Sequence, residues 1–260
     1  VLGFGVRGFG TDQEYRLLEH FALKYDPNLV ILAFAANDLR NNWLALDRNP
    51  AKPYFDLLSD GTLKQRPFTP MPDHSGSWKS ILFAHLHSVR FLYFSAARIP
   101  AIHNALVRFG IYANVIVKPS GPDDLVSNTV YRDPPWPSEW EESWRVTMRL
   151  LREMNNKSNN SGAKFILFSV TRAIQVDDTM FKELEERHPD IALGYDNLDK
   201  RLAAFSLHEG IAYVSSLSAM RELQASGKSV HFPCDGHWSR DAHQRAGELL
   251  ADYLITGGYP

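Results

Sequence analysis

The stretch FPCDGHWSRDAH, residues 232–243, carries the side chains best suited to acid–base chemistry. Asp235 and His237 fall in a predicted loop after the last strand, and Ser239 suits the N-cap of the helix that follows. An ionised Asp235 can hold one tautomer of the His237 imidazole while the other ring nitrogen faces a nucleophile or substrate. The alternative is a structural histidine that only packs or caps, as we expect for His243.

A glycine-rich turn near the start of the chain suits an anion or an oxyanion. In GVRGFGTDQE, glycines at positions 5, 8 and 10 lie between a predicted strand and a predicted helix, so backbone N–H groups point outward beside a helix N-terminus. From Gly3 the stretch also fits the G-x-G-x-x-G dinucleotide fingerprint, but Gly3 lies inside the predicted strand and no acidic residue ends the second strand. We therefore do not favour a nucleotide site.

A second polar group, in AFAANDLRNN, directly follows the second predicted strand. Ligand-binding groups of open α/β sheets collect at the carboxyl ends of strands, where Asn37 and Asp38 stand. The Asn37 amide is a suitable donor to a developing oxyanion. The alternative is that Asn37 or Asp38 only caps a turn.

Four short apolar runs, at residues 1–6, 29–34, 164–170 and 211–214, are typical of strands buried on both faces of a parallel sheet. Helical patterns lie between them. Two begin with a predicted capping box, Thr11 with Glu14 and Ser138 with Glu141. Further helices are predicted over residues 177–187, 196–208 and 239–256. This alternation predicts an α/β fold with a mainly parallel sheet.

A long insert, residues 43–137, follows the second strand and holds proline-rich loops around a predicted helical region at 79–109. Insertions of this length are usually lids or binding elements, and a purely structural cap is the alternative. The apolar stretch that begins at Ile81 is interrupted by histidines and arginines, so we do not expect it to span a membrane.

Charge and cysteine content exclude several classes of partner and site. The chain has 28 Lys+Arg against 30 Asp+Glu, so nothing indicates binding to nucleic acid or to an anionic membrane. The single cysteine, Cys234, excludes an internal disulfide and a cysteine-based zinc cage. A small-molecule partner is favoured.

Taken together and in this order, the glycine turn, AAND and DGH resemble the SGNH (GDSL-type) hydrolase superfamily, and the resemblance spans nearly the whole chain. It implies one domain over residues 1–260 with a flavodoxin-like three-layer α/β/α fold. It also implies hydrolysis of carboxylic esters, often acetyl groups on carbohydrates or lipid acyl chains, and some relatives are acyltransferases.

The resemblance also implies roles for four residues. GFGVRGFGT matches the second block of the family, so the Gly8 N–H would stabilise the oxyanion, and AAND matches the third block, so the Asn37 amide would be the second donor. DGH matches the fifth block, which makes Asp235 and His237 the acid and the base of a triad. The chain departs from the family pattern at Gly3, where the second block has asparagine, and at Ala35, where the third block has glycine.

The first block of the family, G-D-S with the nucleophilic serine, is absent. Its strand would be central in a sheet of order 2-1-3-4-5, and its loss would leave two buried edges with unpaired backbone groups. We therefore expect an N-terminally truncated hydrolase whose serine lies upstream of Val1, or a first strand that comes from another polypeptide. Ser169 and Cys234 lack the strand-to-helix elbow that exposes a nucleophile.

These residues favour a serine ester hydrolase that acts on a small-molecule or carbohydrate acyl ester, with no cofactor. No metal is expected, because His85 and His87 point to different faces of a predicted helix and Asp235 with His237 lacks a third ligand. One alternative is an O-acyltransferase of the same superfamily. Another is a non-catalytic carbohydrate-binding or interaction domain, supported by aromatic residues of the insert that either stack on sugars or only pack: Trp43, Tyr54, Phe55, Trp78 and Trp136.

Overall fold

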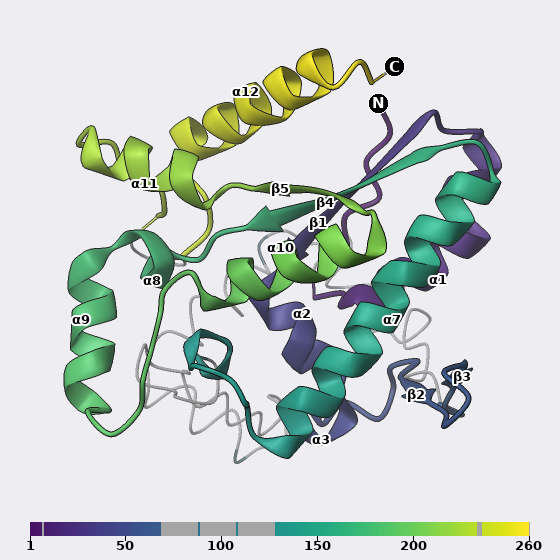
Figure 1. Ribbon diagram of the computed structural model, residues 1–260, viewed down its shortest axis with the longest axis horizontal. Coiled ribbons are helices and arrows are strands. Elements are labelled where there is room, and N and C mark those ends of the chain that lie inside the picture. The colour runs from purple at the N-terminus through teal and green to yellow at the C-terminus, as the bar shows by residue number, and fades with distance from the viewer. Residues whose placement is uncertain (7, 69–87, 89–107, 109–127, 233–235, 260) are drawn as a thin grey trace. The chain divides into compact units, whose positions relative to one another are not determined.

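The computed structural model describes residues 1–6, 8–68, 88, 108, 128–232 and 236–259 (Figure 1). The chain divides into two compact units, one formed by Val1–Thr69 with Pro122–Pro260 and the other by Pro70–Gly121. The first unit holds every helix and strand considered below. Most of the predicted helical region at 79–109, including His85 and His87, lies outside the described residues, as do Trp78, Cys234 and Asp235.

The first unit alternates strands and helices along much of its length. Its strands are β1 (Leu29–Ala35), β2 (Phe55–Leu57), β3 (Leu63–Gln65), β4 (Lys164–Val170) and β5 (Ala212–Ser215). Its α-helices are α1 (Thr11–His20), α2 (Ala36–Asn41), α3 (Leu44–Asp47), α7 (Ser138–Asn160), α8 (Ala173–Val176), α9 (Asp178–Arg187), α10 (Asn197–Glu209), α11 (Leu217–Ala225) and α12 (Arg240–Thr256). Two short 3₁₀ helices, η1 (Ala22–Tyr25) and η2 (Thr129–Tyr131), complete the described elements.

Three strands form a parallel sheet in the order β1-β4-β5, which confirms the predicted α/β class. Ala35 at the end of β1 is in register with Val170 at the end of β4, and Ser169 with Ser215 at the end of β5. The three carboxyl ends therefore lie along one edge of the sheet. The antiparallel hairpin β2-β3 falls within the predicted insert but belongs to the first unit.

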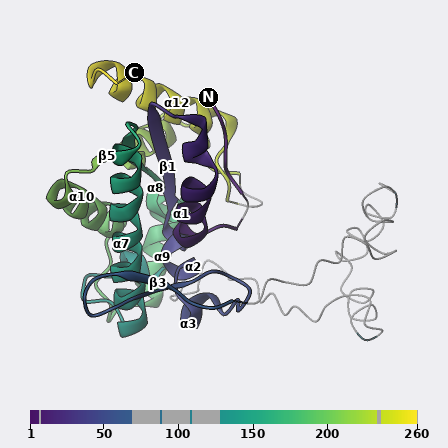
Figure 2. The same ribbon diagram turned by 90° about the vertical axis from the view of Figure 1, so that its right-hand side faces the viewer.

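Helices pack on both faces of the sheet. In Figure 1, α11 and α12 lie above the strands, and α1, α7 and α10 lie below them. Figure 2 shows α1 and α7 running alongside each other. Each face has its own apolar core, because side chains alternate along the strands. Leu32, Phe34, Phe165 and Leu167 face α1, α7 and α10, whereas Ile166, Phe168 and Val214 face α11 and α12.

The first predicted strand, over residues 1–6, is wrong. These residues have no regular secondary structure, and Val1, Leu2 and Val6 are exposed. A strand needs a neighbour for its backbone hydrogen bonds, and β1 pairs only with β4 in the described sheet. The apolar composition of residues 1–6 indicated a strand, but strand formation depends on a partner.

Both predicted capping boxes are also wrong in detail. Helix α1 begins at Thr11 itself with Gly10 as N-cap, and no side chain caps it. Helix α7 begins at Ser138 after Pro137, and the Glu141 carboxylate accepts a hydrogen bond from the Trp136 backbone N–H (2.8 Å). In each case the serine or threonine is the first helical residue, one position past the N-cap. By contrast, the predicted N-cap of the last helix is confirmed, since the Ser239 hydroxyl accepts a hydrogen bond from the Ala242 backbone N–H.

None of the helices in the described ranges is long and apolar enough to cross a membrane.

Candidate functional site at the carboxyl edge of the sheet

Asn37 and Asp38 have different roles at the start of α2, directly after β1. The Asp38 carboxylate accepts a hydrogen bond from the Ala35 backbone N–H (3.0 Å) and is buried, so Asp38 is the capping residue that the sequence left open. The Asn37 side chain is exposed and has no hydrogen bond to the described residues. The structure therefore leaves the Asn37 amide available to a ligand, and Asp38 fixes the backbone that carries it.

The glycine turn lies just before α1 and packs closely against the end of α2. Gly8 is exposed with φ of +81°, a left-handed conformation that favours glycine. A Cβ atom on Gly10 would lie 2.8 Å from Asn42 Oδ1 and 2.9 Å from Asn41 Cβ. Gly8 thus supplies the turn, and Gly10 allows it to approach the helix after β1.

A buried group of ionisable side chains lies beneath both segments. Lys52 Nζ is 3.5 Å from Asp12 Oδ1 and 3.5 Å from Asp47 Oδ2. Burial raises the pKa of Asp12 to about 6 although Lys52 opposes the shift, and burial raises the pKa of Asp38 to about 7. Burial, then the charges of Asp38 and Asp12, raise the pKa of Glu14 to about 9. Sequence reasoning missed this group, which we call the acidic cluster (Asp12, Glu14, Asp38, Asp47 and Lys52), because its members come from four separate segments.

The loop that carries His237 is held at the end of β4. The His237 carbonyl accepts a hydrogen bond from the Phe232 N–H (2.8 Å), and Gly236 turns the chain with φ of +72°. The Trp238 indole N–H donates to the Thr171 carbonyl (3.0 Å), one residue past β4. His237 is exposed, and Asp235, its predicted partner, lies outside the described residues.

A second histidine, which the sequence did not single out, supports this loop. His231 is buried, forms an isolated β-bridge with Trp238, and places Nε2 3.2 Å from the same Thr171 carbonyl. Burial lowers the pKa of His231, so the ring is neutral at pH 7 and Nε2–H donates to that carbonyl. No local pattern could have found this role, because Thr171 is distant in the sequence.

The serines at the carboxyl edge donate to a carboxylate. Ser169 Oγ and Ser215 Oγ donate to Asp199 Oδ1 at 2.7 and 2.6 Å, and the Tyr213 hydroxyl donates to the same oxygen at 3.0 Å. Ser169 is buried. Within the described residues no serine hydroxyl is hydrogen-bonded to a histidine side chain, so this network ties α10 to the sheet and offers no activated nucleophile.

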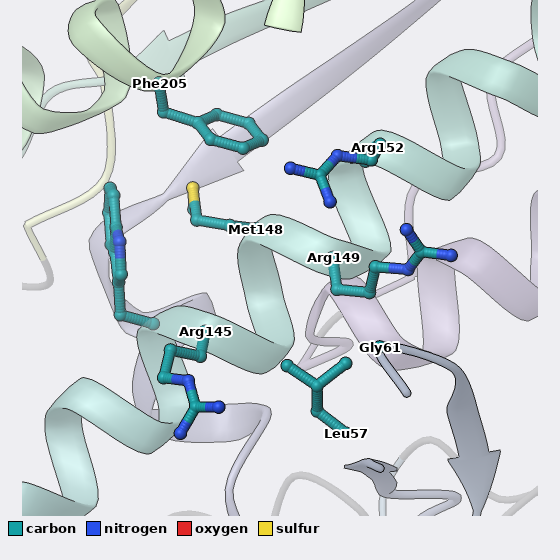
Figure 3. A pocket seen from close by; sticks show the side chains of 8 residues that line it. Leu57, Gly61, Arg145, Met148, Arg149, Arg152 and Phe205 are labelled. Atoms are coloured by element: carbon teal, nitrogen blue, oxygen red, sulfur yellow. The ribbon is translucent and has the colours of Figure 1, made fainter. Parts of the chain in front are cut away.

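A cavity of about 290 Å³ lies elsewhere and is lined by residues of α7, α10 and the β2–β3 hairpin (Figure 3). Apolar side chains and three arginines line it: Leu57, Trp144, Met148 and Phe205 with Arg145, Arg149 and Arg152, beside Gly61. Each arginine is within ion-pair distance of a glutamate, so the lining carries no excess positive charge among these groups. The cavity contains none of the predicted site residues.

Three aromatic side chains of the predicted insert are part of the core. Tyr54, Phe55 and Trp136 are each at most 5% exposed, so their rings cannot stack on a sugar. Trp136 lies edge-on to Trp144, and the Arg201 guanidinium lies 4.0 Å from its ring centre. The alternative of ordinary packing therefore holds for these three residues.

The described residues contain no group of three or more His, Cys, Asp or Glu side chains arranged to hold a metal ion. Comparisons of the chain with models of known protein families, with curated proteins and with solved structures found no match.

Proposed function

We propose that this protein is a serine ester hydrolase of the SGNH type, with a flavodoxin-like fold, that acts on a small-molecule or carbohydrate acyl ester. His237, oriented by Asp235, accepts the proton of a serine nucleophile. The Gly8 N–H and the Asn37 amide stabilise the oxyanion that forms when the serine attacks the ester carbonyl. His237 then donates this proton to the leaving alcohol, which leaves an acyl-enzyme. A water molecule, deprotonated by His237, attacks the acyl-enzyme, and the acid and the free serine are released.

The proposal rests on the observation that the His237 loop is anchored at the carboxyl end of β4. Trp238 and His231 both hold this loop to the Thr171 carbonyl at the end of β4. Asn37 follows β1, the strand that pairs with β4 along its full length. A candidate base and a candidate oxyanion donor, 200 residues apart in the sequence, thus belong to the ends of adjacent parallel strands, where α/β proteins bind ligands.

No serine of the described residues is placed to act as the nucleophile, so the proposal has to assign it a position. The open edge of β1 supports its placement: β1 pairs only with β4 in the described sheet, and Ile31 is 39% exposed although β4 beside it is buried on both faces. Edge strands of natural sheets are usually short, charged or covered, whereas β1 is seven residues long and has only apolar side chains. We place the serine at the carboxyl end of one further strand that pairs with β1.

The test is hydrolysis of p-nitrophenyl acetate by the full-length protein. We expect His237→Ala to lower kcat by about 10³-fold or more, because an unactivated serine is a poor nucleophile. Asn37→Ala should lower kcat by about 10²-fold with little change in KM. His20→Ala is the matched control, since this exposed histidine lies at the end of α1, and it should leave both constants unchanged.

An unchanged rate in His237→Ala would contradict the assignment of the base. Acetyl transfer to an oligosaccharide that outpaces release to water would identify the O-acyltransferase alternative, which uses the same residues. Glycan binding without any turnover would instead indicate a non-catalytic domain.

A further inference from the structure

Helix α2, which carries Asn37, is too short to hold its own orientation. It has six residues, and isolated helices of this length are unstable in water. Three contacts fix it: the Asp38 carboxylate accepts from the backbone at its start, the Leu39 carbonyl accepts from the Ser143 hydroxyl of α7, and the Asn41 carbonyl accepts from Lys52 Nζ (2.6 Å). The last contact places a cation at the C-terminal end of the helix, where its dipole favours positive charge.

The glycine turn is held at the C-terminal end of α2, where Lys52 also binds. The Asp12 backbone N–H donates to Asn42 Oδ1 (3.1 Å), and the Asn42 amide donates to Thr147 of α7 (2.8 Å). The Asp12 carboxylate lies 3.5 Å from Lys52 Nζ. Lys52 therefore contacts both the helix that carries Asn37 and Asp12, the second residue of the helix that follows the glycine turn.

The charge balance around Lys52 makes it hard to replace. Its side chain is 6% exposed, and its ammonium faces Asp12 of α1, Asp47 of α3 and the Tyr54 ring, whose centre is 5.3 Å away. The positive charge of Lys52 also lowers the pKa of the Glu14 and Asp38 carboxyl groups, against the larger effect of burial. Two atoms of the acidic cluster, Asp12 Oδ2 and Glu14 Oε2, are buried without a hydrogen-bond partner among the described residues. Removal of the cation would in addition leave the Asp12 and Asp47 carboxylates without their positive partner.

From these contacts we propose that Lys52 is a positioning residue that sets the glycine turn against α2 and so aligns the Gly8 N–H with the Asn37 amide. The inference rests on the proposed function, since it concerns the oxyanion donors of that reaction. It also gives Lys52, which lies near the start of the predicted insert (residues 43–137), a role at the base of the site.

The experiment compares Lys52→Met, which keeps the apolar stem and removes the charge, with Lys182→Met, an exposed lysine of α9. Amide exchange in the protein is expected to speed up by about tenfold or more at Gly8–Thr11 and over α2 in Lys52→Met, because local opening becomes easier. In the full-length protein, kcat for p-nitrophenyl acetate should fall by about 10- to 100-fold with KM within about twofold, as expected when oxyanion donors are misplaced. Lys182→Met should change neither.

A double variant separates positioning from general stability. Asp12→Asn added to Lys52→Met removes a buried charge, so the melting temperature should recover, but the Asn41 carbonyl still lacks its donor and kcat should stay low. Full recovery of kcat together with the melting temperature would overturn the proposal, and so would unchanged amide exchange in Lys52→Met. If the unaltered protein has no esterase activity, the proposed function fails, whereas the exchange comparison still decides whether Lys52 holds the two segments.

Discussion

The two sides of the candidate site are supported by different kinds of interaction. The glycine–asparagine side, which carries Gly8 and Asn37, rests on the acidic cluster beneath α1 and α2. The histidine side, which carries His237, rests on neutral donors, the Trp238 indole and the His231 imidazole, that share one carbonyl after β4. Charged and neutral supports respond differently to pH, so the comparison can be tested.

The direction of each response follows from the shifted pKa values. Folding raises the pKa of Glu14 and of Asp38, so the folded state holds their protons more tightly than the unfolded state. The free energy of unfolding is therefore highest at low pH and falls as pH rises from the ordinary carboxyl pKa towards the raised values. Burial lowers the pKa of His231, so its contribution is present above the ordinary histidine pKa and is lost as pH falls. Alkali should loosen the glycine–asparagine side, and acid should loosen the histidine side.

The largest predicted effect is the pH dependence of the glycine–asparagine side. As pH rises from about 5 to about 8, the Glu14 carboxyl stays protonated in the folded state and ionises in the unfolded state, so the free energy of unfolding should fall by at most about 1.4 kcal/mol per pH unit for this group. Glu14→Gln should flatten that slope in urea titrations. The control is Glu186→Gln, at an exposed glutamate of α9, and an equal slope in both variants would contradict the raised pKa.

The next effect concerns how closely the glycine turn fits against α2. Gly10→Ala would push a methyl group into Asn42 and Asn41, which are buried, and should lower the free energy of unfolding by about 1–3 kcal/mol. Gly247→Ala is the matched variant, because a Cβ there meets nothing within 4 Å and lies inside α12, where alanine is favoured by about 1 kcal/mol. Chemical denaturation of the two variants should therefore give shifts of opposite sign.

The smallest effect is on the histidine side. Trp238→Phe keeps an aromatic ring against Phe168 but removes the indole donor to Thr171, while His231 still donates to that carbonyl. The expected loss is about 1 kcal/mol, the usual net value of one hydrogen bond. Amide exchange should accelerate at Gly236–Trp238 and stay unchanged at Gly8–Thr11. Faster exchange at both places would mean that the two sides are not independently supported.

The sequence predicted much of the fold because strand and helix patterns are local. Three of the four apolar runs became β1, β4 and β5, and the predicted helices over residues 177–187, 196–208 and 239–256 correspond to α9, α10 and α12. The strand over residues 1–6 failed because pairing depends on a neighbour. Short elements such as α2 and α8 were not predicted, because their few residues carry no periodic pattern and tertiary contacts stabilise them.

For the candidate site, the sequence by itself determined which residue types occur in which order along the chain: the glycine turn, then Asn37 after β1, then the segment of Asp235 and His237 before α12. Chemistry and chain order are local properties, so they can be read directly. Only the tertiary structure decided that Asp38 caps α2 while Asn37 stays exposed, that His231 and Trp238 share the Thr171 carbonyl, and that Lys52 lies between two aspartates. Burial and pKa depend on which distant segments surround a group, and that is known only once the chain has folded.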